Sequence, residues 1–293
     1  MVHRIRMLLE MIRFSHTLFA LPFALLSAAL AWKGKNEFSW IELSGIVACM
    51  VFARSAAMAF NRLTDRGIDA ANPRTAQRHL PVGQLSTANV ALFAMICGAG
   101  FVASTFIFLL RDNAWPALLA VPVLGFIFIY SYTKRFTVLS HFWLGVSLML
   151  APVAAWIAIR GLNGLATPLV LGSAVLFWVA GFDILYACQD IDFDRLAGLF
   201  SIPSRIGVQG SLWVALLCHL VMLGLLVCLW AVSPHLGWIY LVGVGCVAVL
   251  LAYEHWLVRP DDLTRVNQAF FHVNGIISVG LLLVVLLQLA VNP

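Results

Sequence analysis

Nine long apolar runs constrain the fold of this chain more than any other feature of its sequence. Each holds about 20 mainly apolar residues, the length of an α-helix that crosses the hydrocarbon core of a bilayer. The runs lie at approximately residues 14–32, 44–63, 88–110, 115–132, 138–159, 167–187, 211–231, 236–256 and 268–290. Since unpaired backbone groups are costly in lipid, such runs fold as helices. We predict an all-α polytopic membrane protein with nine transmembrane helices, forming one domain over residues 1–293.

The composition supports the same class of protein. Of the 293 residues, 62% are hydrophobic and 11% are charged, whereas about a quarter of the residues of soluble domains are charged. The net charge of +5 is a feature of many nucleic-acid-binding proteins, but here the basic side chains lie in short segments between apolar runs. The lipid bilayer is therefore the predicted partner, and nucleic acid is not.

The distribution of Lys and Arg predicts the orientation. With nine spans the two ends of the chain lie on opposite sides, and basic residues are enriched in cytoplasmic segments. If the N-terminus is cytoplasmic, 13 of the 18 Lys and Arg residues lie inside, four lie outside, and Arg54 lies within a span. We expect an inner-membrane protein of the bacterial type, with its N-terminus and its two longest loops, at about 64–87 and 188–210, in the cytoplasm.

Two sets of polar side chains stand at the cytoplasmic ends of predicted spans. Asn61, Asp65 and Asp69 are spaced four residues apart, so on a helix they share one face. The second set has spacings of three, four and four. Its members are Asp183, Tyr186, Asp190 and Asp194. The spacing predicts that four or five acids face one place.

Clustered carboxylates at a bilayer boundary repel each other unless a cation joins them. Oxygen ligands suit Mg²⁺, which typically bridges one or two carboxylates to substrate phosphates. We interpret the two sets as a diphosphate-binding Mg²⁺ site, with Asp65, Asp69, Asp190 and Asp194 as ligands and catalytic residues. The alternative is that these acids only mark the water boundary. Asp183 lies deeper, as a support for a ligand or as a partner of a basic group such as Arg54.

Basic residues near these acids have two interpretations each. Arg54 lies seven residues before Asn61 on the same helix face, so it either neutralises carboxylates or binds a substrate carboxylate or diphosphate. Four further basic residues end a span or lie in a long loop, where topology alone places such residues. They are also candidates for binding diphosphate: Arg74, Arg78, Lys134 and Arg135.

The motifs resemble those of the UbiA superfamily of intramembrane aromatic prenyltransferases, and the resemblance covers essentially the whole chain. The matching segments are Asn61-x-x-x-Asp65-x-x-x-Asp69, Asn72-Pro73-Arg74-Thr75-Ala76-x-Arg78-x-Leu80-Pro81-x-Gly83, Asp183-x-x-Tyr186-x-x-x-Asp190-x-x-x-Asp194 and Ser201-Ile202-Pro203. Arg62 departs from the pattern, because many members have an acid after the asparagine.

The resemblance implies transfer of a polyprenyl group from its diphosphate to an aromatic acid, with Mg²⁺ held by the two aspartate motifs and Asn61 nearby. It implies helices around a central cavity, capped by cytoplasmic loops and opening sideways to lipid. Arg54, Tyr186 and Asp183 are then expected to bind substrate. The spacing from Arg54 to Asn61 is most similar to that of 4-hydroxybenzoate polyprenyltransferases of ubiquinone synthesis.

Two other functions remain open at this point. Enzymes that prenylate 1,4-dihydroxy-6-naphthoate for menaquinone resemble the chain nearly as well, and both acceptors carry a carboxylate and a phenolic hydroxyl. An ion-coupled secondary transporter also pairs intramembrane acids within internal repeats. Its acids lie near the bilayer midplane, whereas those of this chain are predicted at one end of the spans, which favours an enzyme.

Overall fold

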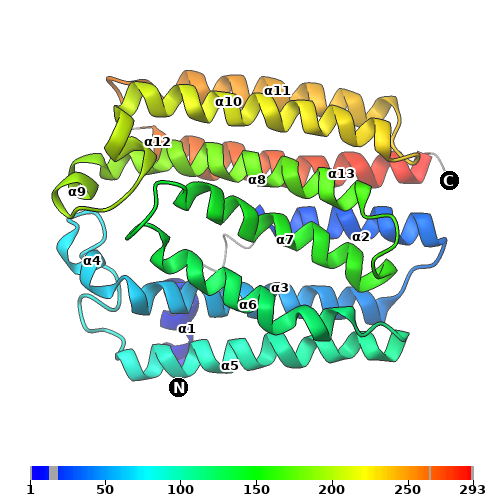
Figure 1. Ribbon diagram of the computed structural model, residues 1–293, viewed down its shortest axis with the longest axis horizontal. Helices are drawn as coiled ribbons and strands as arrows, with labels where there is room; N and C mark the ends of the chain where they lie inside the picture. Colours follow the sequence, from blue (N-terminus) through cyan, green and yellow to red (C-terminus); the bar gives the residue numbers. More distant parts are fainter. Residues whose placement is uncertain (1, 13–18, 264, 292–293) are drawn as a thin grey trace. The chain divides into compact units, whose positions relative to one another are not determined.

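The computed structural model describes residues 2–12, 19–263 and 265–291 and contains helices joined by short loops (Figure 1). The α-helices are α1 (Val2–Met11), α2 (Leu21–Lys35), α3 (Trp40–Thr64), α4 (Arg66–Ala71), α5 (Thr87–Thr105), α6 (Trp115–Thr133), α7 (Ser140–Arg160), α8 (Ala166–Ala187), α9 (Ile191–Leu196), α10 (Ile202–Val232), α11 (Trp238–Leu257), α12 (Val266–Gln268) and α13 (Asn274–Val291). Three shorter helical segments are η2 (Phe106–Arg111), η3 (Cys188–Asp190) and η4 (Ala269–Val273). The predicted all-α class is confirmed.

Eight helices in the described residues are long and apolar enough to cross a membrane. They are Trp40–Thr64, Thr87–Arg111, Trp115–Thr133, Ser140–Arg160, Ala166–Leu196, Ile202–Val232, Trp238–Leu257 and Phe271–Val291. Each overlaps one predicted span. The ninth, 14–32, begins in residues outside the described part, and its described remainder is the 15-residue helix α2. A count of nine therefore stays a prediction, as does the orientation that depends on it.

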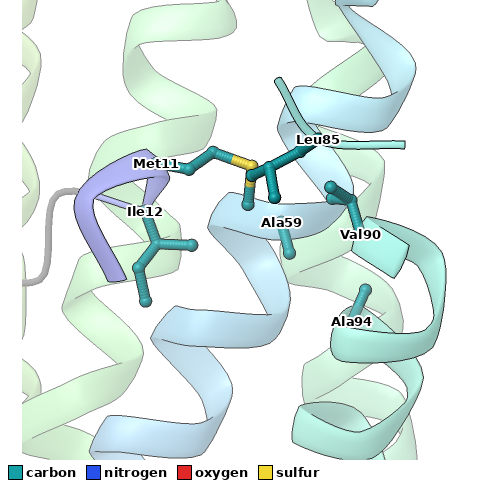
Figure 2. Close-up of a cluster of buried hydrophobic side chains, with 6 residues drawn as sticks. All are labelled: Met11, Ile12, Ala59, Leu85, Val90 and Ala94. Carbon is teal, nitrogen blue, oxygen red and sulfur yellow. The ribbon is translucent and has the colours of Figure 1, made fainter. Parts of the chain in front are cut away.

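The chain divides into two compact units, and the prediction of a single domain remains untested. The first unit comprises residues 1–17 and 41–132. In its core, Met11 at the end of α1 and Ile12 just after it pack with Ala59 of α3 and with the start of α5 (Figure 2). Ala59 is fully buried, which lets these larger side chains lie against the α3 backbone. The N-terminal helix is thus fixed beside the end of α3 that carries the first acidic set.

The second unit comprises residues 18–40 and 133–293 and is organised around α8. Helices α7 and α10 both pack against α8 (Figure 1). A methyl group added at Gly145 of α7 would lie 2.5 Å from the carbonyl oxygen of Leu176, and one at Gly172 of α8 would lie 2.9 Å from Met149. Small residues allow close helix packing in membranes. These glycines set the antiparallel register of α7 and α8.

Two buried hydrogen bonds between side chains link three helices of the second unit. The indole nitrogen of Trp178 donates to Asn274 Oδ1 at 2.6 Å, and Asn274 Nδ2 donates to Glu254 Oε1 at 2.8 Å. All three side chains are at most 1% exposed. Since buried polar groups are costly when unpaired, the Asn274 side chain stabilises the fold by bonding the Trp178 indole of α8 and the Glu254 carboxyl group of α11.

We predict that Asn274→Ala lowers stability by about 1–3 kcal/mol for each partner left unpaired, because Trp178 and Glu254 both lose their bond. Thermal unfolding of the purified protein in detergent measures the effect as a lower Tm. Asn267→Ala is the matched control, since Asn267 is exposed and makes only a 3.5 Å contact with Gln189. Equal Tm values for the two variants would contradict a stabilising role for the hydrogen bonds of Asn274.

Candidate active site

The first acidic set lies at the junction of α3 and α4. Helix α3 ends at Thr64, and Asp65 has φ −93° and ψ 5°, so the set does not lie on one continuous helix as predicted. Helical backbone hydrogen bonds between residues four apart nevertheless continue through the break. Asp65 N donates to Asn61 O at 2.9 Å, and Asp69 N donates to Asp65 O at 2.7 Å. The spacing of the set is therefore kept. Asn61 Nδ2 donates to Asp65 Oδ2 at 2.8 Å and fixes that carboxylate.

Asp69 is 5% exposed and is held by two arginines. Arg78 Nη1 lies 2.6 Å from Asp69 Oδ1, and Arg62 Nη1 lies 3.6 Å from Oδ2. Oδ2 is buried without a hydrogen bond. Thr75 Oγ1 also donates to the Asp69 carbonyl at 3.0 Å, which folds the following loop back onto α4. Arg62, which departs from the family pattern, thus supplies positive charge to the second acid of its own motif.

The second acidic set repeats this geometry. Helix α8 ends at Ala187, and Asp190, the last residue of η3, has φ −105° and ψ 8°, close to the values of Asp65. Each of the two breaks is followed by a six-residue helix, α4 or α9, that carries the second acid. Asp194 is 2% exposed, and its Oδ2 is buried without a hydrogen bond, as in Asp69. Asp192 of the same helix is exposed.

The predicted basic residues differ in their surroundings. Arg78 pairs with Asp69, whereas Arg74 is exposed in the same loop, its backbone N–H donating to Asn72 Oδ1 at 2.9 Å. Lys134 lies between α6 and α7, where its carbonyl accepts from Phe200 N at 2.7 Å, and Arg135 beside it is exposed. This bond brings the Lys134 backbone to the segment that follows Asp194.

Arg54 lies in the middle of α3 with a half-buried side chain. Its Nε is buried without a hydrogen bond, and within the described residues of its own unit no carboxylate forms an ion pair with it. The interpretation of Arg54 as a group that neutralises neighbouring protein carboxylates therefore finds no support within that unit.

One pairing was missed by the sequence interpretation. His141 Nδ1 of α7 lies 2.7 Å from Asp183 Oδ2 of α8, and the His141 side chain is fully buried. His141 was not singled out because it lies 42 residues from Asp183, with no local motif to connect them. The remaining member of the second set, Tyr186, is half-buried near the end of α8.

The acids fit a divalent metal in the chemistry of their donors. Carboxylate oxygens are the ligands that Mg²⁺ prefers, and the buried Oδ2 atoms of Asp69 and Asp194 have no hydrogen bond from any described residue. In the described part of the chain, no three His, Cys, Asp or Glu side chains are grouped closely enough to hold a metal ion. Because Mg²⁺ commonly takes one or two carboxylates and completes its shell with water and phosphate, this arrangement suits a metal bound together with a substrate.

Apolar spanning helices with a set of acids at a helix junction in each unit are the features of an integral membrane protein with polar groups at helix ends. The chain belongs to the UbiA prenyltransferase family, whose model matches residues 20–276. It is a prenyltransferase, and the membership of this family that its motifs predicted is confirmed.

Known proteins are similar to the chain over most of its length. A 4-hydroxybenzoate octaprenyltransferase of Acidovorax ebreus is 31% identical over 269 residues, which are 89% of this chain and 88% of that protein. The apo structure of a UbiA homolog from Aeropyrum pernix is 30% identical, with a TM-score of 0.82 over 95% of this chain and 98% of that one. A UbiA homolog from Archaeoglobus fulgidus, bound to DMAPP and Mg²⁺, has the same fold with a TM-score of 0.69 and 20% identity, covering 97% of this chain and 99% of that one.

Proposed function

We propose that the protein transfers a polyprenyl group from polyprenyl diphosphate to 4-hydroxybenzoate, with Mg²⁺, in ubiquinone biosynthesis. The acceptor is supported by the similarity to the Acidovorax ebreus enzyme over nearly the whole chain. Use of a prenyl diphosphate with Mg²⁺ is supported by the homolog that binds DMAPP and Mg²⁺. The cytoplasmic face of a bacterial-type inner membrane is the proposed location of the site, since the basic residues are concentrated in the segments that would lie there.

The four aspartates are the proposed ligands. Asp65, Asp69, Asp190 and Asp194 would hold Mg²⁺, and the bound metal would supply a Lewis acid for the charge that develops on the leaving diphosphate. Asn61 fixes Asp65 through their 2.8 Å hydrogen bond. Arg78 and Arg62 hold Asp69 with its buried Oδ2, so the carboxylate is oriented before substrate binds.

Basic residues complete the proposed diphosphate site. Positive groups aimed at developing negative charge lower the barrier to breaking the allylic C–O bond. We assign this role to Arg74, Arg78, Lys134 and Arg135. The allylic cation that remains is attacked by the electron-rich ring at the carbon ortho to the hydroxyl, with Tyr186 beside the reacting groups. Loss of the ring proton then restores aromaticity.

The observation that most supports an acid as the acceptor is the guanidinium of Arg54 in α3, whose Nε has no hydrogen-bond partner among the described residues. A guanidinium within a membrane span is costly unless an anion pairs with it, and among the described residues of its own unit Arg54 has no such partner. It lies seven residues before Asn61 on the same helix, about 10 Å deeper along the axis. A carboxylate bound there leaves the hydroxyl-bearing edge of the ring directed towards the diphosphate end.

We predict that Arg54→Ala weakens use of 4-hydroxybenzoate by about 10²-fold or more while leaving prenyl diphosphate binding nearly unchanged, because a site built for an anion loses its paired charge. Initial rates are measured with geranyl diphosphate and three acceptors: 4-hydroxybenzoate, 1,4-dihydroxy-6-naphthoate and a carboxylate-free quinol precursor. Ser44→Ala, at an exposed hydroxyl near the other end of α3, is the matched control.

The three acceptors separate the possible results. Preference for the naphthoate would move the protein to menaquinone synthesis and keep the role of Arg54. Preference for the carboxylate-free ring, or equal losses with all three acceptors in Arg54→Ala, would overturn that role.

A further inference from the structure

The paired side chains of His141 and Asp183 form a dyad within the second unit. Their 2.7 Å contact joins the first turn of α7 to the last part of α8. The imidazole is completely buried, whereas 17% of the Asp183 side chain is exposed. The aspartate is therefore the member that a substrate reaches, and the histidine lies behind it.

The packing of α7 on α8 places His141 against Asp183. Gly145 lies four residues after His141, on the same face of α7, and faces the backbone of Leu176, about two turns before Asp183 on α8. One turn farther along α7, Met149 contacts Gly172 of α8, so both contacts belong to the same antiparallel pairing of the two helices. Since the helices run antiparallel, this register carries the helix start at His141 to the level of Asp183.

The contact between the two side chains fixes the orientation of Asp183. Within the described residues, His141 Nε2 is buried and has no hydrogen-bond partner, so the ring is held through Nδ1. His141 Nδ1 lies against Asp183 Oδ2, in the arrangement by which a partner fixes the orientation of a reacting group. Asp183 Oδ1 takes no part in this contact and remains for a substrate.

The position of Asp183 along its span, relative to Asp190, also suits contact with a substrate. It precedes Asp190 by seven residues, which is about 10 Å along a helix. If Asp190 binds the diphosphate, Asp183 lies deeper in the span, beyond the diphosphate and towards the prenyl carbon that reacts. Arg54 has the corresponding depth relative to Asn61 in its own unit.

We propose that Asp183 accepts the ring proton of the aromatic acceptor and that His141 is the positioning residue that keeps Asp183 correctly oriented. This inference rests on the proposed prenyl transfer to an aromatic ring. After the new C–C bond has formed, the C–H bond at the same ring carbon breaks and its electron pair restores the aromatic ring. The proton moves to Asp183 Oδ1, and the resulting carboxylic acid releases it to water when the product leaves.

The test is the kinetic isotope effect with 4-hydroxybenzoate deuterated at both carbons ortho to the hydroxyl. In the unaltered protein we expect an effect near unity, because breaking the allylic C–O bond limits the rate. His141→Leu should lower kcat by about 10- to 100-fold, the loss typical when the outer partner of an active group is removed. The isotope effect should then rise clearly above unity, because proton loss has become slow.

Two amide variants separate positioning from packing. His141→Asn places an N–H donor where Nδ1 lies and should keep an isotope effect near unity, whereas His141→Gln places it where Nε2 lies and should behave like His141→Leu. Ser147→Ala, at a hydroxyl bonded within α7 to the Trp143 carbonyl, is the control and should leave kcat unchanged. Binding of geranyl diphosphate shows whether each variant is folded.

An isotope effect that stays near unity in both His141→Leu and His141→Gln would overturn the proposal, as would equal kinetics of the Asn and Gln variants. Failure of the proposed function is a separate result, because it appears in the unaltered protein as no transfer to 4-hydroxybenzoate. The isotope experiment then uses the ring-deuterated form of the acceptor that is turned over, and its outcomes keep the same meaning.

Discussion

Asp190→Ala is expected to lower the rate of prenyl transfer by about 10²-fold or more, and Asp65→Ala by a similar factor, since each removes one strong electrostatic contact that matters most as charge develops on the diphosphate. Both residues lie at the break between a spanning helix and a six-residue helix, with nearly the same backbone angles. Substitution there removes the carboxylate without requiring the helix ends to move. Initial rates at saturating substrate, with Mg²⁺ present, measure the loss.

Asp192→Ala is the matched control. Asp192 lies two residues from Asp190 in the same segment and has the same charge, but it is exposed to the surroundings whereas Asp190 is 7% exposed. Its substitution should leave the rate within about twofold, as expected for a solvated surface charge. Equal losses at Asp190 and Asp192 would mean that net charge near the loop matters, and that the assignment of one carboxylate as a ligand is wrong.

The spans were predictable because a bilayer imposes one simple requirement on each of them. About 20 apolar residues in succession have few alternatives to a helix in lipid, so eight of the predicted runs appear as helices at nearly the predicted positions. The breaks at Asp65 and Asp190 were not predicted. Periodicity locates side chains on a helix, but the end of a helix depends on local backbone angles that a four-residue spacing does not reveal.

The acids themselves were found from spacing, but most of their partners were not. Arg62 follows Asn61 directly and was noted only as a departure from the family pattern, yet it lies 3.6 Å from Asp69. His141 required the register of α7 on α8, which depends on the small residues Gly145 and Gly172 and on no local motif. Pairings between distant helices are set by packing, and a single sequence carries little signal of them.

Removal of divalent metal is expected to reduce prenyl transfer to background, and added Mg²⁺ or Mn²⁺ should restore it. The reason lies in the charges of the proposed site. The diphosphate is an anion and the proposed ligands are four carboxylates, two of which, Asp69 and Asp194, have a buried oxygen without a hydrogen bond. Bringing these anions together without a cation is strongly unfavourable where water is scarce.

The arginines near Asp69 do not replace the metal. Arg78 and Arg62 already lie on Asp69, while Asp194 has no Lys or Arg within ion-pair distance in the described residues, so the second set depends more on an added cation. Purified protein is assayed with excess EDTA, with EDTA presaturated with Mg²⁺ as the control, and with Mg²⁺ returned after chelation. Binding of geranyl diphosphate should weaken in parallel with turnover, because the metal and the diphosphate enter the site together. Undiminished turnover in excess EDTA would show that basic side chains alone neutralise the diphosphate, and the four aspartates would then need a different role.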